Sequence, residues 1–213
     1  MDKSLLKKGS SQLGIALSEN QISDFQILLE EMKKWGNKIN ITALLNNENR
    51  LIEELFIDSL APLLFINNLN LENKSLLDIG SGGGFPGLPL KIADPSLTVT
   101  LSDSIEKKVF FIKHVIRKLK LEKTNALTFR FGSNDSGGPE LCSFDFATSK
   151  AVTHIDQLST WALPYLKKGG HLICLKSPQQ DTLQPEGYNE VEPFSYFLPF
   201  SQAGRKLYIY KKI

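Results

Sequence analysis

The feature that most constrains this fold is a glycine-rich segment that directly follows a short apolar run. The run Leu76–Ile79 leads into Gly80–Gly87, in which five of the eight residues are glycine. Glycine permits sharp turns and close approach of the backbone to a ligand, because it has no Cβ. Doubly wound α/β sheets bind nucleotides where a strand runs into such a turn before a helix. The segment therefore predicts an α/β fold with a ligand site at the carboxyl end of its first strand.

The chain after Asn73 supports this fold, because short apolar runs alternate there with amphipathic stretches. Strands are expected at Ser75–Gly80, Leu97–Asp103, Leu127–Phe131, Phe144–Ser149 and His171–Lys176, and helices at 87–93, 105–120 and 154–166. Such alternation predicts a parallel, doubly wound sheet. The last two runs, Val191–Phe197 and Lys206–Tyr210, have only a loop between them, which predicts an antiparallel hairpin at the sheet edge.

Residues 1–70 are expected to form a helical extension. Ser18 and Gln21 fit a capping box at the start of a helix that should end near Gly36. A second helix is expected from about Glu48 toward Ile66, kinked or divided by Pro62. No long linker interrupts the chain, so residues 71–213 are expected to form one compact ligand-binding domain with this extension.

Composition excludes several classes of protein. The 213 residues contain two cysteines, too few for a disulfide scaffold, and three scattered histidines, which predict no metal site. The longest apolar stretch, Leu60–Ile66, is far shorter than the roughly 18 residues that suggest a membrane helix. No secretory signal is recognisable. We therefore expect a soluble cytoplasmic protein.

Positive charge is distributed unevenly along the chain. The net charge is +2, but residues 1–70 contain 7 Lys and Arg against 9 Asp and Glu, so the basic excess lies later. Much of it is concentrated in one stripe: Lys107, Lys108, Lys113, Arg117, Lys118, Lys120 and Lys123. Such a stripe can bind nucleic-acid phosphates. It can equally be a solvated helix face, and charge alone does not decide between them.

Three ligands compete for the glycine-rich segment. A P-loop requires Lys and then Ser or Thr after its last glycine, but Leu88 and Pro89 follow Gly87. A dinucleotide fingerprint would begin two residues late, and Pro86 removes a backbone donor that a pyrophosphate needs. S-adenosylmethionine (SAM) sites resemble Asp/Glu-x-Gly-x-Gly-x-Gly, which the chain matches without a gap at Asp78, Gly80, Gly82 and Gly84. SAM is therefore the favoured ligand, with a purely structural turn as the alternative.

Asp103 supports a nucleoside ligand. It ends the second expected strand, where a carboxylate can accept hydrogen bonds from both ribose hydroxyls. This feature fits NAD as well as SAM. A strand-end aspartate can also simply cap the next helix.

The absence of two known motifs excludes some methyl-transfer reactions. Enzymes that methylate exocyclic amines resemble one another in an Asn/Asp-Pro-Pro-Tyr/Phe motif, but the chain reads Thr-Ser-Lys-Ala-Val at residues 148–152. No Pro-Cys nucleophile is present, and both Cys142 and Cys174 are interpreted as structural. No general base is evident. This suits an acceptor with a free lone pair, such as guanine N7, for which alignment is the main requirement.

Across nearly its whole length the chain resembles the RsmG/GidB family of bacterial 16S rRNA guanine-N7 methyltransferases. The resemblance rests on five segments: Trp35–Thr42, Ile57–Leu60, the Pro-Gly-ending loop Gly80–Gly87, Ser102–Val109 and Leu175–Lys176. Four positions depart from the family pattern. Leu55 replaces a histidine, Gly132 replaces an acidic residue, Lys150 replaces an arginine and Ser177 replaces a glycine. Lysine keeps the charge of arginine but loses its planar fork.

The resemblance implies a class I SAM-dependent methyltransferase fold, Rossmann-like, with about seven strands and an antiparallel last hairpin. It implies methyl transfer from SAM to N7 of a guanine in 16S rRNA or the small ribosomal subunit, by a monomer. The cofactor would be bound by Asp78, Gly80, Gly82, Gly84, Phe85, Asp103, Phe131, Gly132 and Lys150, with Lys150 and Lys176 as candidate catalytic residues. Another RNA or small-molecule substrate, a SAM-binding paralogue without efficient catalysis, and an NAD(P)-dependent oxidoreductase are the alternatives.

Overall fold

The structure is a computed structural model that describes residues 1–36, 39–133, 136–150, 153–177 and 184–213. Four residues of the sequence motifs lie outside this part of the chain, namely Asn37, Lys38, Ala151 and Val152. Within the described part, no helix is both long enough and apolar enough to span a membrane.

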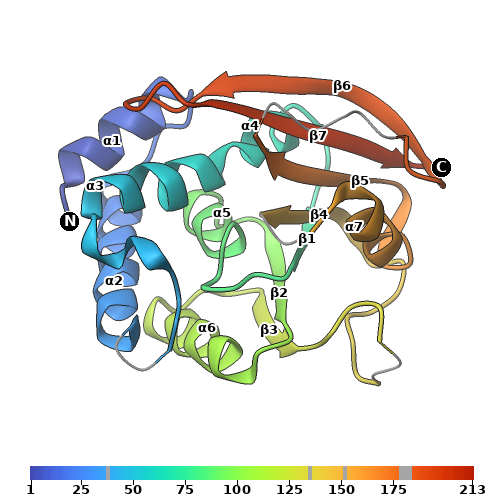
Figure 1. Cartoon of the computed structure of the whole chain (residues 1–213), viewed down its shortest axis with the longest axis horizontal. Coiled ribbons are helices and arrows are strands. Elements are labelled where there is room, and N and C mark those ends of the chain that lie inside the picture. The colour runs from blue at the N-terminus through green and yellow to red at the C-terminus, as the bar shows by residue number, and fades with distance from the viewer. Residues whose placement is uncertain (37–38, 134–135, 151–152, 178–183) are drawn as a thin grey trace.

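A seven-stranded mixed sheet forms the centre of the molecule (Figure 1). Its strand order is β3-β2-β1-β4-β5-β7-β6, and β7 runs antiparallel to both of its neighbours. The strands are β1 (Ser75–Ile79), β2 (Thr98–Asp103), β3 (Thr124–Thr128), β4 (Phe144–Lys150), β5 (Leu166–Lys176), β6 (Tyr188–Phe197) and β7 (Gly204–Lys212). The expected parallel sheet with an antiparallel last hairpin is confirmed.

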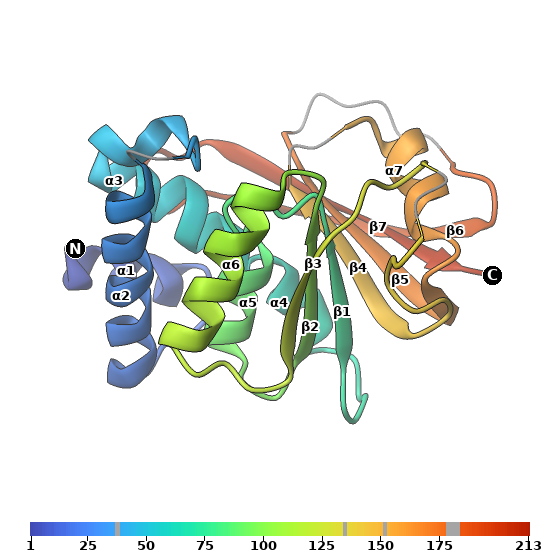
Figure 2. The same cartoon turned by 90° about the horizontal axis from the view of Figure 1, so that it is seen from below.

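Helices cover both faces of the sheet, as Figure 2 shows. One face packs against α5 (Gly87–Ala93), α6 (Glu106–Lys118) and the N-terminal helices, whereas α7 (Ile155–Ala162) covers the other. Successive strand residues point to opposite faces. Leu76 therefore joins the core beneath the N-terminal helices, and its neighbour Leu77 joins the core beneath α7.

The described part of the first 70 residues consists mainly of helices, as expected. They form α1 (Lys3–Gln12), α2 (Glu19–Gly36), η1 (Ala43–Asn46), α3 (Glu48–Leu51), η2 (Ile52–Ile57), η3 (Asp58–Leu60) and α4 (Pro62–Ile66). The capping box is confirmed, because Ser18 N–H donates to Gln21 Oε1 (2.7 Å) and Gln21 N–H donates to Ser18 Oγ (3.3 Å). Pro62 begins a new helix, whereas η2 is π-helical, which the sequence pattern did not predict.

The extension and the sheet share one hydrophobic core. Phe25 of α2 packs against Phe56 of η2 with ring centroids 5.1 Å apart, and both belong to the same buried cluster as Leu101 and Phe146 of the sheet. The extension therefore contributes to the layer behind the ligand-binding edge of the sheet. A division between residues 70 and 71 stays a prediction.

Several boundaries differ from those expected: β6 begins at Tyr188 and β7 covers Gly204–Lys212, and three further differences have a clear physical reason. The third strand is Thr124–Thr128 rather than Leu127–Phe131, because Phe129 and Phe131 pack edge-on against each other (5.0 Å) in the following loop instead of continuing the edge strand. Helix α7 ends at Ala162 rather than 166, since Pro164 cannot continue a helix. Strand β5 then begins at Leu166, which pairs with Phe144, rather than at His171.

Candidate active site

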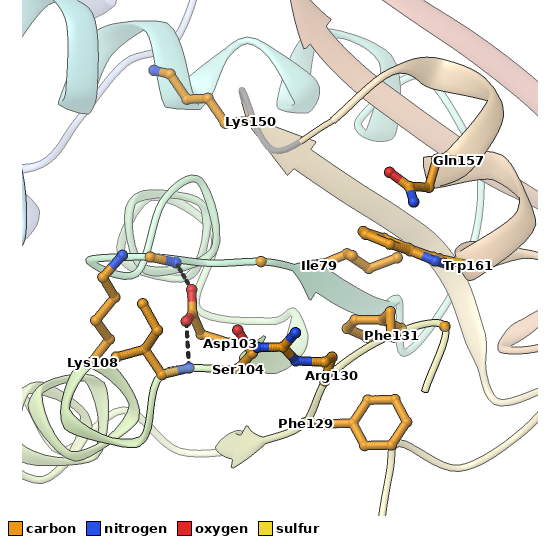
Figure 3. Close-up of a pocket in the computed structure, with 14 residues that line it drawn as sticks. Ile79, Asp103, Ser104, Lys108, Phe129, Arg130, Phe131, Lys150, Gln157 and Trp161 are labelled. Atoms are coloured by element: carbon orange, nitrogen blue, oxygen red, sulfur yellow. Dashed lines mark hydrogen bonds between the residues drawn. The ribbon is translucent and has the colours of Figure 1, made fainter. Parts of the chain in front are cut away.

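A cavity of about 690 Å³ opens at the carboxyl ends of β1, β2 and β4 (Figure 3). It is lined by Ile79, Gly80, Gly82, Asp103, Ser104, Ile105, Lys108, Phe129, Arg130, Phe131, Gly132, Lys150, Gln157 and Trp161. The volume lies within the usual range for a small-molecule site. Six of the nine predicted cofactor residues line this cavity: Gly80, Gly82, Asp103, Phe131, Gly132 and Lys150.

The glycine-rich turn exposes its backbone to the cavity at Gly82. Gly82 has φ +58°, and a Cβ added there would meet no atom within 4 Å. Positive φ favours glycine, and the open space allows a ligand to approach the main chain closely. The turn is held in place by Ser81, whose N–H donates to Ser102 O (2.9 Å) and whose Oγ accepts from Ser102 N–H (3.1 Å).

Asp103 joins the turn to the start of α6. Its Oδ2 accepts from Gly82 N–H and its Oδ1 from Ile105 N–H, each at 2.8 Å, as the dashed lines in Figure 3 show. The residue is only 7% exposed, but it lines the cavity. Each carboxylate oxygen can accept more than one hydrogen bond. Asp103 therefore supports the turn before α6 and retains acceptor capacity toward a ligand.

Asp78 lies behind the cavity and does not line it. The residue is fully buried, and its Oδ2 accepts from Gly87 N–H (2.8 Å) while its Oδ1 has no hydrogen-bond partner. Burial raises the pKa of this carboxyl to about 7. Asp78 thus links β1 to the first residue of α5.

Gly84 and Phe85 also shape the turn from behind. Neither residue lines the cavity. The Phe85 ring stacks on Phe56 of η2 with centroids 6.1 Å apart. A Cβ at the neighbouring Gly83 would lie 2.5 Å from Ile41 Cγ2. The N-terminal extension therefore packs directly against the glycine-rich turn.

Aromatic side chains form the wall opposite the glycine-rich turn. Phe131 stacks with Trp161 of α7 at a centroid distance of 6.3 Å, and Phe129 packs edge-on against Phe131. A Cβ at Gly132 (φ +75°) would lie 2.5 Å from Trp161 Nε1. Because position 132 has no side chain, the indole can occupy this space. Gly132, which replaces an acidic residue of the family pattern, thus makes room for the Trp161 ring in this wall.

Sequence reasoning missed several residues of this wall. Phe129, Gln157 and Trp161 line the cavity, but none of them belongs to the glycine motif or the strand-end pattern. The available signal was the amphipathic stretch at 154–166, which follows the strand that ends at the cavity. It predicted a helix there without indicating which of its residues face a ligand.

Lys150 lines the cavity, but its ammonium group is directed toward the N-terminal extension (Figure 3). Nζ lies 2.7 Å from Asp58 Oδ2 and also donates to the carbonyl of Glu54. Burial lowers the pKa of this lysine, and the nearby Asp58 opposes that shift. Its charge is therefore neutralised within the protein in this structure.

Lys176 and two of the four departures, Leu55 and Ser177, lie outside the cavity lining. The Lys176 ammonium donates to the carbonyl of Thr153. Leu55 is half-buried in η2, and Ser177 is exposed just after β5. Of the four departures from the family pattern, only Gly132 and Lys150 line the cavity.

The sheet order, the antiparallel β7 and a cavity at the carboxyl ends of β1 and β2 define the class I SAM-dependent methyltransferase fold. Solved structures of other proteins have a similar fold. A SAM-dependent methyltransferase from Aquifex aeolicus has a TM-score of 0.56 and 16% identity, covering 79% of this chain and 95% of that one. TrmN from Thermus thermophilus has a TM-score of 0.55 and 16% identity, covering 73% and 48%. These similarities confirm the expected fold.

The family follows from sequence. Residues 21–204 match the model of GidB, rRNA small subunit methyltransferase G. Ribosomal RNA small subunit methyltransferase G of Alkaliphilus metalliredigens is 33% identical, covering 99% of this chain and 90% of its own. The protein of that name from Clostridium botulinum strain Alaska E43 is 39% identical over 82% of this chain and 72% of its own. The chain belongs to the rRNA small subunit methyltransferase G family, which confirms the expected family and enzyme class.

Proposed function

We propose that this enzyme transfers a methyl group from SAM to N7 of a guanine in 16S rRNA. The observation that carries the proposal is the pairing of Asp103 with the open backbone of Gly82 at one cavity, in a chain of this family. Homologous methyltransferases imply SAM as the donor.

The lining residues fit this cofactor. Asp103 would accept hydrogen bonds from the ribose hydroxyls, and the bare backbone at Gly82 would admit the ligand close to the turn. Phe131 and Trp161 would contact the adenine through their stacked rings. When bound, SAM supplies an electrophilic methyl group on its sulfonium.

The chemistry of the cavity favours guanine N7 as the methyl acceptor. Guanine N7 carries a free lone pair, so no proton must leave before methyl transfer. The described cavity lining offers no cysteine nucleophile, because Cys174 is buried in β5 and the exposed Cys142 is also not part of the lining. The chain then needs chiefly to align donor and acceptor. Lys108 and Arg130 line the same cavity and would place positive charge near the RNA phosphates.

The test is transfer of labelled methyl from SAM to small ribosomal subunits that lack the modification. The proposal expects label in the RNA fraction and none in the ribosomal proteins. Gly82→Val should abolish transfer and SAM binding, because the branched side chain would fill the space that the ligand needs. Calorimetry on the parent should detect binding of SAM but not of NAD.

Gly137→Val is the matched control. Gly137 also has positive φ (+87°) and open space around a Cβ, but it does not line the cavity. This substitution imposes the same backbone strain without affecting the ligand. A folded Gly82→Val protein that still bound SAM would contradict the assignment of the cavity.

A further inference from the structure

Helix α6 borders a second groove that is distinct from the cofactor cavity. This groove lies between α6 and the region where α2 ends, and both cartoon views show these two helices as neighbours (Figures 1 and 2). Its volume is about 400 Å³, and its lining consists of Trp35, Ile39, Lys107, Phe110, His114 and Arg117. We call it the α2–α6 groove.

The aromatic residues of the α2–α6 groove are held in place but remain accessible. Phe110 is 54% exposed, whereas the next residue, Phe111, is fully buried. Trp35 packs edge-on against Phe111 (5.8 Å) and lies tilted against the His114 ring (5.3 Å). Large exposed aromatic side chains beside a groove are typical of binding surfaces. Phe110 and Trp35 therefore offer ring surface to a flat partner.

Two basic residues of α6, Lys107 and Arg117, line the groove beside these rings, and α6 as a whole is basic. From Glu106 to Lys118, α6 carries one acidic residue and five basic ones: Lys107, Lys108, Lys113, Arg117 and Lys118. None of these five forms an ion pair with another residue that the structure describes, whereas Lys33 and Lys34 of α2 pair with Glu48 and Glu31.

The carboxylate of Glu31, which contacts the groove residue His114, does not oppose this charge. Glu31 contacts both Lys34 (2.7 Å) and His114 Nε2 (2.8 Å), so its negative charge is compensated locally. The α2–α6 groove thus presents aromatic rings together with free cations, which is complementary to an unpaired nucleotide.

We propose that the α2–α6 groove binds an unpaired nucleotide of the RNA substrate that flanks the target base. The base stacks on Phe110 and Trp35, and Lys107 and Arg117 contact the phosphates. The neighbouring residue Lys108 lines the cofactor cavity, so the start of α6 borders both the groove and the reaction site. This inference rests on the proposed rRNA substrate.

The two tryptophans of the chain allow a direct test, because Trp35 lines the α2–α6 groove and Trp161 the cofactor cavity. In a Trp161→Phe protein Trp35 is the single tryptophan, and excitation that is selective for tryptophan reports on it alone. This protein is titrated with a single-stranded oligoribonucleotide, with the same backbone carrying abasic residues, and with polyglutamate. The proposal expects quenching of Trp35 by the intact oligonucleotide and little quenching by the other two. Equal quenching by the abasic strand or by polyglutamate would overturn base stacking.

Variants distinguish the contribution of base stacking to oligonucleotide binding from that of positive charge. Phe110→Ala should weaken binding of the intact oligonucleotide roughly tenfold and leave the abasic strand unaffected, because only the intact strand has a base that loses its stacking partner. Replacing Lys107 and Arg117 with alanine should reduce the salt dependence of binding for both strands. The controls are Phe197→Ala, a 66% exposed ring on β6, and Lys168→Ala, an exposed lysine on β5. Parent-like binding by Phe110→Ala would overturn the proposal.

Methyl transfer to small subunits distinguishes failure of this inference from failure of the proposed function. Phe110→Ala should raise KM for the subunit about tenfold, with kcat and SAM affinity close to those of the parent. An unchanged KM would contradict nucleotide binding in the α2–α6 groove and leave the proposed function intact. If the parent transferred no methyl group to rRNA, the proposed function would fail. The oligonucleotide titration would still show whether a nucleotide binds in the α2–α6 groove.

Discussion

Asp78 and Asp103 show how strongly the surroundings of a carboxylate determine its role. Both lie near the carboxyl end of a strand beside the glycine-rich turn, and the sequence predicts both as cofactor residues. In the structure Asp103 lines the cavity, whereas Asp78 is fully buried against Gly87 N–H. A linear motif identifies residues near the ligand, but it does not show which of them are covered by the next turn of chain.

Asp103→Ala should weaken SAM binding by about 1–3 kcal/mol, because two ribose hydroxyls lose a charged acceptor. Calorimetry measures the change. Asp94→Ala is the matched control, since Asp94 accepts from Ser96 N–H (3.0 Å) in a comparable turn away from the cavity. Unchanged SAM affinity in Asp103→Ala would mean that Asp103 only supports the turn before α6.

Asp78 should make the stability of the protein depend on pH. Its pKa is about 7 in the folded chain against an ordinary value of 3.8, so the folded state binds more protons between these values. Stability therefore falls as pH rises from about 4 to 7. Asp78→Asn cannot ionise, so its stability relative to the parent should increase over the same window. Urea unfolding of both proteins at several pH values measures this, and a constant difference would refute the burial effect.

At the scale of elements, one buried ion cluster joins the N-terminal extension to the sheet. Asp58 of η3 lies 2.7 Å from Lys150 Nζ of β4, and its other oxygen accepts from the Tyr196 hydroxyl of β6 (2.7 Å). Arg205 Nε of β7 lies 3.7 Å from the same oxygen. Lys150 therefore contributes to positioning the extension against the cavity.

Asp58→Ala should destabilise the protein by roughly 3–5 kcal/mol, because it leaves a buried lysine without its counter-charge. Asp58 is 3% exposed. Lys7→Ala, which breaks the exposed Lys7–Glu19 pair, should have little effect. Urea unfolding compares the two variants with the parent. A loss in Asp58→Ala as small as that in Lys7→Ala would show that this cluster does not hold the extension in place.

The sequence predicts elements well where a local pattern determines them. The buried parallel strands, the capping box at Ser18 and the hairpin of β6 and β7 follow from periodicity and turn chemistry. The third strand was misplaced, because apolar Phe129 and Phe131 suggest a strand but pack into a loop. Such a choice depends on tertiary contacts with α7, which a local pattern does not contain.

At the scale of the whole molecule, α6 connects the two sites. Lys108 and Ile105 line the cofactor cavity, and Lys107 and Phe110 line the α2–α6 groove. The cofactor side could be predicted from sequence, because its glycine turn is one continuous motif and Asp103 ends the next strand. The groove could not be predicted, because it requires α2 to pack beside α6. The basic stripe indicated only that phosphates could bind.

The most direct test of the central claim is to identify the methylated atom. The enzyme is incubated with methyl-labelled SAM and small ribosomal subunits lacking the modification, and the 16S rRNA is digested to nucleosides and mapped. We predict that the label elutes as 7-methylguanosine from one position of the 16S rRNA, and that the Gly82→Val protein yields no labelled nucleoside. Label in a different nucleoside, in ribosomal protein or in no product at all would contradict this prediction.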